Sequence, residues 1–444
     1  MTKLFSKKAL KPCYFSHPKI IAISTLVVGI FTTSVYSFDL KEAWKAAETH
    51  SSELQKNRYE FEANQQQLPI ARAALLPQIG ANISYQKQKQ SLPSSITRNS
   101  QSWRVSASQT IFNLNKWYKY QGSKFAVIAA ENQFDLAKQQ LLLRVAEAYF
   151  NALIAQESLI TIQKAQQSFL TQQRQAEAQF KKGATTIVDV QEAQTGYESA
   201  VADEIEVTSQ LVQANAQLKT YTGLDIDQIE QINDYNLINF PWYTSEQWIQ
   251  LVDKNNFEIK LQAAVTEQTK QELKAIQAYH VPTVEMSTGL YRNPNDYQSN
   301  DLIQDYDTKA SYIGVGLSIP IFSGGETRAQ TKQANATYLA AKSELDMIRE
   351  KTHLSATENF AKVRAGKMRI KALEKLVLTS KTKVSSSTLG QKYGLSNNTD
   401  KIRAEKEYYE AQLKLTQAKY EYLQAQLNLM QLAGLFNINI LNPH

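Results

Sequence analysis

Four segments of the chain alternate between apolar and polar residues, which is the pattern of a β-strand with one face toward an apolar environment. They form two pairs, at 79–92 and 99–112 and again at 284–293 and 310–322. Each segment is about ten residues long, as are the strands of a transmembrane barrel. The strands of a soluble β-sandwich would alternate in the same way, so the pattern by itself leaves both architectures open.

Two long proline-free stretches, at 94–240 and 321–442, can be helical throughout. In each stretch one glycine is suited to the turn of a helical hairpin and another to the end of the return helix: Gly183 and Gly223 in the first, and Gly394 and Gly434 in the second. Glutamine is abundant along these helices, so much of their circumference is polar. Such helices fit the wall of a water-filled tube, and they also fit a solvent-exposed coiled coil.

The second half of the chain repeats the first. From Glu147 and Glu358 onward the halves align at a constant offset of 211 residues. Within this part, 183–224 and 394–435 share ten identities in 42 positions, where about three are expected by chance. Two capping-box patterns, which start helices, are also repeated: Asp39 with Glu42, and Thr244 with Gln247. We therefore predict a signal peptide at 1–37, a first repeat at 38–235 and a second at 236–444. Each repeat would contain a helix, two strands and a long helical hairpin.

The first 37 residues have the features of a secretory signal peptide. Basic residues precede the apolar run 20–31, and Val35, Tyr36 and Ser37 place small or branched residues before a cleavage point. An uncleaved anchor is the alternative, although the run is too short to span a bilayer comfortably. No later segment has about eighteen consecutive apolar residues, so a mature chain that spans a membrane would have to use strands.

The excess of positive charge lies in this leader. The formal net charge is +7, but five lysines precede the first acidic residue, Asp39, and the remaining chain has 44 basic and 42 acidic groups. Binding to nucleic acid therefore loses support. The only cysteine, Cys13, is also in the leader, which removes disulfides and cysteine chemistry from the rest. Because the histidines have no partners at ligand spacing and no phosphate loop occurs, we expect no enzyme, no cofactor and no metal site.

Several motifs together resemble the TolC family of outer-membrane efflux proteins: ARAALLPQ at 71–78, QTIF at 109–112, AYFN at 148–151, PIFSGG at 320–325 and the two hairpin turns. The resemblance extends from about Asp39 to Asn442. It implies a mainly α fold with β, in which a homotrimer forms a twelve-stranded β-barrel in the outer membrane from four strands per protomer. The long helices would continue the barrel as a tunnel across the periplasm.

The resemblance also implies a function. Family members are passive ducts for efflux and type I secretion. They dock a periplasmic adaptor (membrane fusion) protein and an inner-membrane transporter of the RND, ABC or MFS class, and they export drugs, small molecules or polypeptides. The competing interpretation is a periplasmic adaptor or structural coiled-coil protein without a channel. An adaptor would have one hairpin between β-rich halves, whereas here the strand pair and the hairpin both occur twice.

On this resemblance, the periplasmic entrance lies near the hairpin turns, where the family uses side-chain links and acidic rings. Asp189 and Asp400 occupy the aspartate positions after the two turns, although a carboxylate there could simply cap its helix. The sequence departs from the family pattern at three positions, because Gln391 replaces a tyrosine, Ser396 an arginine and Arg403 a second acid. An ion pair between Asp400 and Arg403 is allowed by their spacing, and we expect a weaker cation preference than with two acidic rings.

The adaptor contact of the family lies at the turns themselves. In this chain it corresponds to Gly183 and Ala184 in the first turn and to Gly394 and Leu395 in the second.

Overall fold

The computed structural model describes residues 38–91, 96–225, 229–230, 238, 240–299 and 302–438, with the side chains of 96–98, 295–299 and 302–306 left aside. The predicted signal peptide at 1–37 lies outside the described residues, as does the repeat boundary predicted near residue 235.

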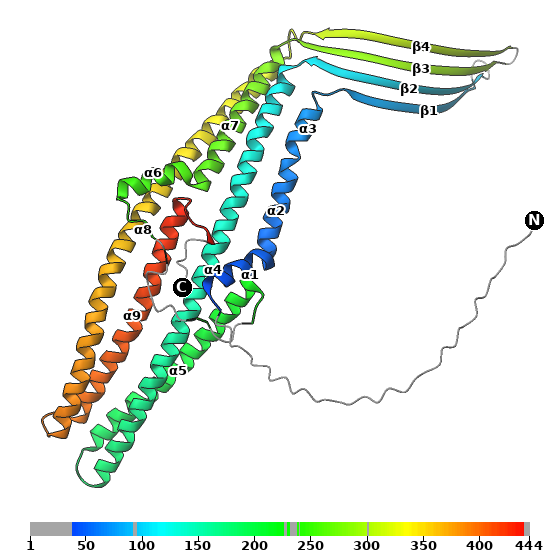
Figure 1. Ribbon diagram of the computed structural model, residues 1–444. Helices are drawn as coiled ribbons and strands as arrows, with labels where there is room; N and C mark the ends of the chain where they lie inside the picture. The colour runs from blue at the N-terminus through cyan, green and yellow to red at the C-terminus, as the bar shows by residue number, and fades with distance from the viewer. Residues whose placement is uncertain are drawn as a thin grey trace, which may run out of the picture. The chain divides into compact units, whose positions relative to one another are not determined.

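The described residues form helices and one group of strands (Figure 1). In chain order the elements are α1 (Leu40–His50), α2 (Ser52–Gln65), α3 (Gln67–Ala73), β1 (Gln78–Gln90), β2 (Ile96–Phe112), α4 (Leu114–Lys181), α5 (Ile187–Thr222), α6 (Ser245–Asn255), α7 (Phe257–Gln277), the short 3₁₀ helix η1 (Ala278–His280), β3 (Thr283–Ser299), β4 (Leu302–Ser318), α8 (Glu326–Lys392) and α9 (Asn398–Leu432).

The order of elements in the first half recurs in the second. In each half short helices lead to two strands, and the strands lead to a long helix and a shorter return helix. The two predicted capping boxes are confirmed at the starts of α1 and α6. None of the described helices is both long and apolar enough to cross a membrane.

The four strands form one antiparallel sheet in the order β1-β2-β3-β4 (Figure 1). The register pairs Ala81 with Val105, Val105 with Leu290, and Leu290 with Ser311. Residues that pair across neighbouring strands point to the same side of a sheet, so the alternating apolar positions of all four strands share one face. The residues one position along each strand are paired with one another as well, and they point to the other face: Gly80, Ser106, Gly289 and Tyr312.

β2, β3 and β4 have 17 residues each and are longer than the alternation predicted, whereas β1, with 13 residues, is not. Their pairing continues into the segments expected to be loops, 91–100 and 293–308. The sequence missed these ends because polar residues there interrupt the alternation, which removes the period of two. In contrast, β4 ends at Ser318 instead of at the predicted residue 322, since Pro320 has no N–H for a ladder hydrogen bond.

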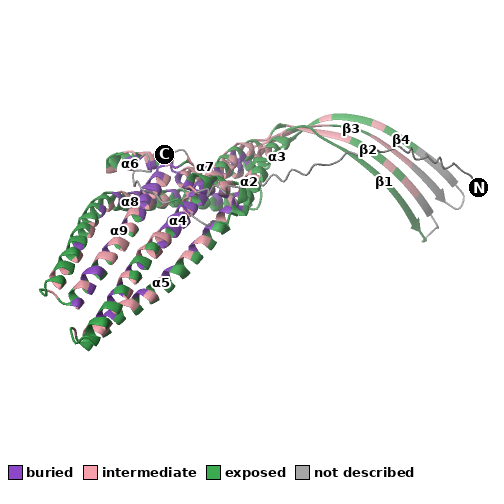
Figure 2. Ribbon diagram, turned by 60° about the horizontal axis from the view of Figure 1, so that its bottom comes forward, coloured by how far each residue is buried: buried purple, intermediate pink, exposed green. Residues whose placement is uncertain are grey.

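The helical core is built around α4. Val145, Tyr149 and Leu153 recur at every fourth residue and are fully buried, so they form one face of the helix. The Tyr149 hydroxyl donates to the backbone oxygens of Phe38 and Glu230 at 3.0 and 3.2 Å. Burial raises the pKa of this hydroxyl, which keeps it a donor. Figure 2 shows buried residues gathered on the helices, while almost all described strand residues are intermediate or exposed.

Each return helix ends at a glycine that packs against a short helix. Gly223 follows α5 with a φ of 73°, and a Cβ there would lie 2.5 Å from Nδ1 of His50. Gly434 follows α9 with a φ of 66°, and a Cβ there would lie 2.7 Å from the backbone oxygen of Asn255. Because His50 and Asn255 end α1 and α6, both halves use the same close contact to fix the return helix, and only glycine fits.

Candidate functional site

The first hairpin turn joins α4 to α5. Gly183 has a φ of 70°, in the left-handed region that favours glycine. Its N–H donates to the oxygen of Phe180, and the N–H of Ala184 donates to the oxygen of Gln179, both at 2.9 Å. These two bonds form a Schellman motif, which satisfies the last carbonyl groups of α4. The prediction that Gly183 makes the turn is confirmed.

The second hairpin turn, between α8 and α9, has the same construction. Gly394 has a φ of 74°, and its N–H donates to the oxygen of Gln391 at 3.2 Å. The N–H of Leu395 donates to the oxygen of Gly390 at 2.8 Å. The two halves of the chain therefore end their long helices with one and the same motif.

Asp189 is the third residue of α5 and caps the start of that helix. Its carboxylate accepts hydrogen bonds from the hydroxyls of Thr185 and Thr186, each at 2.7 Å, and from the N–H of Thr186 at 3.1 Å. Its own N–H donates to the Thr186 hydroxyl, which completes a capping box. The bond from Thr185, followed by that from Thr186, lowers the pKa of the Asp189 carboxyl. These contacts are those of a helix cap, one of the two roles considered for this residue.

Asp400 holds the equivalent position in α9. Its N–H donates to Oδ1 of Asn397 at 2.7 Å, and its carboxylate accepts from the Asn397 N–H at 3.4 Å. Arg403 lies one turn further along α9 and is exposed. The ion pair that their spacing allows is not formed, since no salt bridge joins Asp400 to Arg403 within the described part of the chain.

Gln391 and Ser396 make their hydrogen bonds inside the second hairpin. Gln391 donates through Nε2 to Oδ1 of Asn398 at 3.1 Å. Ser396 donates to the backbone oxygen of Ser387 at 2.9 Å, which adds a further partner near the end of α8.

The two hairpins of one chain meet near the turns. The Thr399 hydroxyl of α9 donates to Oδ1 of Asp189 at 3.5 Å, which is long for an O–H···O bond. A small buried apolar cluster also joins the hairpins, made of residues from α4, α5 and α9: Ala165, Phe169, Ala176, Ala193, Ala200 and Ile402.

Large apolar side chains surround the turns, and of these only Leu395 was predicted as part of a contact site. They are between 44% and 84% exposed: Phe180, Val188, Leu389, Tyr393 and Leu395. Several exposed apolar side chains close together mark a contact surface. The signal that could have found them is the presence of apolar residues beside each turn glycine in helices that are otherwise rich in glutamine.

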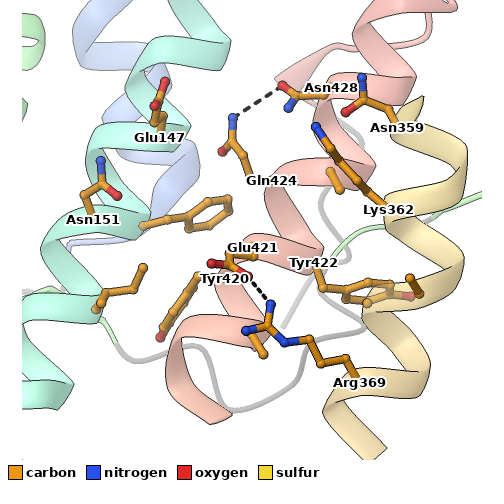
Figure 3. A pocket seen from close by; sticks show the side chains of 16 residues that line it. Glu147, Asn151, Asn359, Lys362, Arg369, Tyr420, Glu421, Tyr422, Gln424 and Asn428 are labelled. Atoms are coloured by element: carbon orange, nitrogen blue, oxygen red, sulfur yellow. Dashed lines mark hydrogen bonds and ion pairs between the residues drawn. The ribbon is translucent and has the colours of Figure 1, made fainter. Parts of the chain in front are cut away.

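A cavity of about 540 Å³ lies between α4, α8 and α9 (Figure 3). The rings of Phe150, Tyr420 and Tyr422 line it, and the Arg369 guanidinium lies 2.6 Å from the Glu421 carboxylate. Its charged lining residues are two acids and two bases: Glu147, Glu421, Lys362 and Arg369. The lining therefore has no formal net charge and favours neither anions nor cations.

Among the described residues, no three His, Cys, Asp or Glu side chains gather in a way that could hold a metal ion. His353, for which the sequence spacing indicates no partner, has Nε2 at 2.7 Å from Oδ1 of Asp253. The pair links α8 to α6, and its separation of 100 residues hides it from any search for local motifs.

The model of the outer membrane efflux protein family matches residues 44–224 and 248–435. Among curated relatives, the proteases secretion protein PrtF of Dickeya chrysanthemi is 28% identical, with 93% of this chain and 92% of that protein covered. The outer membrane protein TolC of Vibrio cholerae is 24% identical, with 92% and 93% covered. Among solved structures, CusC superposes with a TM-score of 0.79 at 16% identity, over 90% of this chain and 93% of that one.

The chain therefore belongs to the outer membrane efflux protein family. It is an outer-membrane efflux channel protein that extends into the periplasm, as the TolC resemblance implied. The expected fold class, a mainly helical chain that contributes a four-stranded sheet, is also confirmed.

Proposed function

We propose that three copies of the chain assemble into one channel, with twelve strands in the outer membrane and the long helices as a periplasmic tunnel. The observation that carries this proposal is the open sheet. Within the described residues β1 pairs only with β2, and β4 only with β3. Two free edges in lipid would leave rows of backbone N–H and C=O groups unpaired, at several kcal/mol for each group. A neighbouring copy removes this cost if its β4 pairs with β1.

Disulfide cross-linking tests the assembly. The only cysteine, Cys13, lies in the predicted signal peptide, so introduced cysteines would be the only thiols of the processed chain. We would combine one cysteine between 79 and 85 in β1 with one between 313 and 317 in β4. The matched control moves the first cysteine to Val105 in β2, which β3 separates from β4. Dimers and trimers should form for some β1–β4 pairs and for none of the controls. A complete set of β1–β4 pairs that yields only monomers would exclude the closed ring.

We propose polypeptide export by type I secretion as the leading use of the duct, with drug efflux as the second. The curated relative PrtF is named for protease secretion, and AprF of Pseudomonas aeruginosa, 27% identical, is named for alkaline protease secretion. TolC of Vibrio cholerae is slightly less similar, at 24%. Deleting the gene and measuring both secreted proteins and drug susceptibility separates the two uses. Loss of a secreted protein with unchanged drug susceptibility is the expected result.

We propose that a periplasmic adaptor protein binds the two hairpin turns and connects the duct to an inner-membrane transporter of the ABC, RND or MFS class. The turns expose apolar surface that would be buried in such a contact, with Leu395 84% and Val188 61% exposed. Leu395→Asp should abolish export while trimers remain intact. A charge at this site is a sharper probe than one at Gly183 or Gly394, where a side chain would also strain the left-handed backbone.

A matched control for docking is Leu378→Asp, which places the same charge on an exposed leucine of α8 that lies 16 residues before the turn. Export should survive this change. If Leu395→Asp exports at the wild-type level, the adaptor binds elsewhere, most simply along the hairpin sides.

We propose that the entrance lies at the turns and conducts passively, with no catalytic step. The charges of Asp189, Asp400 and Arg403 would determine the electrostatic potential at the entrance. Gln391 and Ser396 would maintain the conformation of the second turn through their hydrogen bonds. In a trimer Asp400 and Arg403 together contribute three carboxylates and three guanidinium groups, so the two rings are formally neutral. Conductance in planar bilayers tests this proposal, because a strong cation selectivity unchanged by Arg403→Asp would place that ring away from the entrance.

A further inference from the structure

α4 of the first hairpin and α9 of the second lie side by side (Figure 1). The contact between them, which we call the seam, contains two carboxylates that each accept hydrogen bonds from the opposite helix.

The first carboxylate belongs to Glu405 of α9, which is 6% exposed. It accepts from the Ser168 hydroxyl and, at 2.6 Å, from Nε2 of Gln172, both on α4. Lys401 lies 3.9 Å away on the same helix as a partial counter-charge. Gln172 is 1% exposed, and its Oε1 has no hydrogen-bond partner within the described residues. A buried carboxylate is costly unless it is paired or hydrogen-bonded, so Glu405 needs both donors of α4.

The second carboxylate belongs to Glu157 of α4. It accepts from the Thr416 hydroxyl at 3.1 Å and from the Tyr420 hydroxyl at 2.6 Å, both on α9. The donors are again four residues apart, as Ser168 and Gln172 are. Residues with this spacing lie on one face of a helix.

The Glu405 site and the Glu157 site have the same arrangement, with the carboxylate and its donors exchanged between α4 and α9. Glu157 and Ser168 are 11 residues apart on α4, and Glu405 and Thr416 are 11 apart on α9. Eleven residues are close to three helical turns, so both arrangements face the same seam in one antiparallel register. Between them the Tyr409 hydroxyl donates to the backbone oxygen of Lys164 at 3.4 Å. A one-residue slip of α9 along α4 would break all these bonds together.

We propose that Glu157 and Glu405 are a matched pair of positioning residues, which fix the register of α9 on α4 and so hold the two hairpins of a protomer together. This inference rests on the proposed duct, because only a duct has an entrance that the two hairpins could keep closed. Both carboxylates are bound by side chains of the opposite hairpin, so each adds a directional link to the apolar contacts between the two hairpins. Glu405 lies 11 residues beyond Gly394, which is about 16 Å along the helix axis from the turn.

The test compares four single variants. Glu157→Ala and Glu405→Ala remove one acceptor each. Glu157→Gln is the conservative variant, because its amide oxygen can accept from Tyr420 and its amide nitrogen can donate to the Thr416 hydroxyl oxygen. Glu405→Gln is less suitable, since it would leave Lys401 without a charged partner. Glu410→Ala is the matched control, because it removes an exposed acid from the same helix.

Two readouts are needed for each variant. Amide hydrogen exchange over 157–172 and 405–420 reports opening of the seam, whether or not the protein conducts. Planar-bilayer conductance reports the entrance. Loss of two hydrogen bonds at their usual net value should raise seam exchange about 30-fold in either alanine variant, with a higher basal conductance. Glu157→Gln and Glu410→Ala should behave as wild type, and all variants should migrate as the same oligomer.

Wild-type exchange and conductance in both alanine variants would overturn the proposal. So would a Glu157→Gln variant as open as Glu157→Ala, because a hydrogen-bond role predicts rescue. Alanine variants that exchange faster but still never conduct would instead refute the duct, and the exchange data would still show that the two carboxylates hold the seam.

Discussion

An arginine on the apolar face of the sheet should cost stability in proportion to its depth in the bilayer. Lys309 of β4 lies in one row with Arg292 and Trp103, residue types that suit the rim of a bilayer. From Ile313 the apolar positions of this face continue beyond the strand to Phe322. Val315 is six residues from Lys309, about 20 Å along the strand and about 15 Å in depth at a tilt near 40°. That places it close to the bilayer midplane. Val105 is two residues from Trp103, about 5 Å below the same rim.

Val315→Arg should therefore cost about 2 to 4 kcal/mol in the free energy of unfolding, and Val105→Arg about 1 kcal/mol. The matched control is Gly314→Arg, which adds the same charge on the other face, where a Cβ meets no atom within 4 Å. Reversible unfolding from lipid vesicles by guanidinium gives the three values. Equal costs for Val315→Arg and Gly314→Arg, or a larger cost at Val105, would refute the assignment of the lipid face.

Three further outcomes are expected. Hydrogen bonds lower the pKa of Asp189, so the stability that Asp189→Asn removes should be constant above the ordinary aspartate range and vanish as pH falls through the lowered pKa. In Thr185→Val the Asp189 contribution to stability should disappear at a higher pH than in the wild type. Thermal unfolding against pH measures both effects. Arg403→Asp should raise cation selectivity, read from the reversal potential in a salt gradient. Gly434→Ala should cost more than the roughly 1 kcal/mol expected of Gly183→Ala, since only Gly434 would also press a Cβ against the Asn255 backbone; equal melting temperatures would contradict this.

Local sequence patterns predicted the structural features that depend on residues close together in the sequence. Gly183 was predictable as a turn because no other residue takes a positive φ at so little cost. The shared apolar face followed from alternation, since one register brings all four apolar series to one side. The strand ends were not predictable, because pairing there continues through residues that do not alternate between apolar and polar. The partners of Glu405 were equally hidden, since they lie 233 and 237 residues away and no helical or strand period connects them.

The strength of the contacts between the hairpins indicates where the entrance would begin to open. At the level of the turns, Gln391 and Ser396 bond within their own hairpin, and the hydrogen bond found between the hairpins there is the 3.5 Å bond from Thr399 to Asp189. A bond of that length contributes less than the usual 0.5 to 1.5 kcal/mol or so. Glu405 accepts two short bonds in a buried site, which together contribute about 1 to 3 kcal/mol or more. The turns should therefore separate first, and the separation should stop at Glu405 unless that carboxylate is removed. Faster hydrogen exchange at 183–200 than at 157–172 in the wild type is the expected sign, and the reverse order would show that the turns hold the closed state.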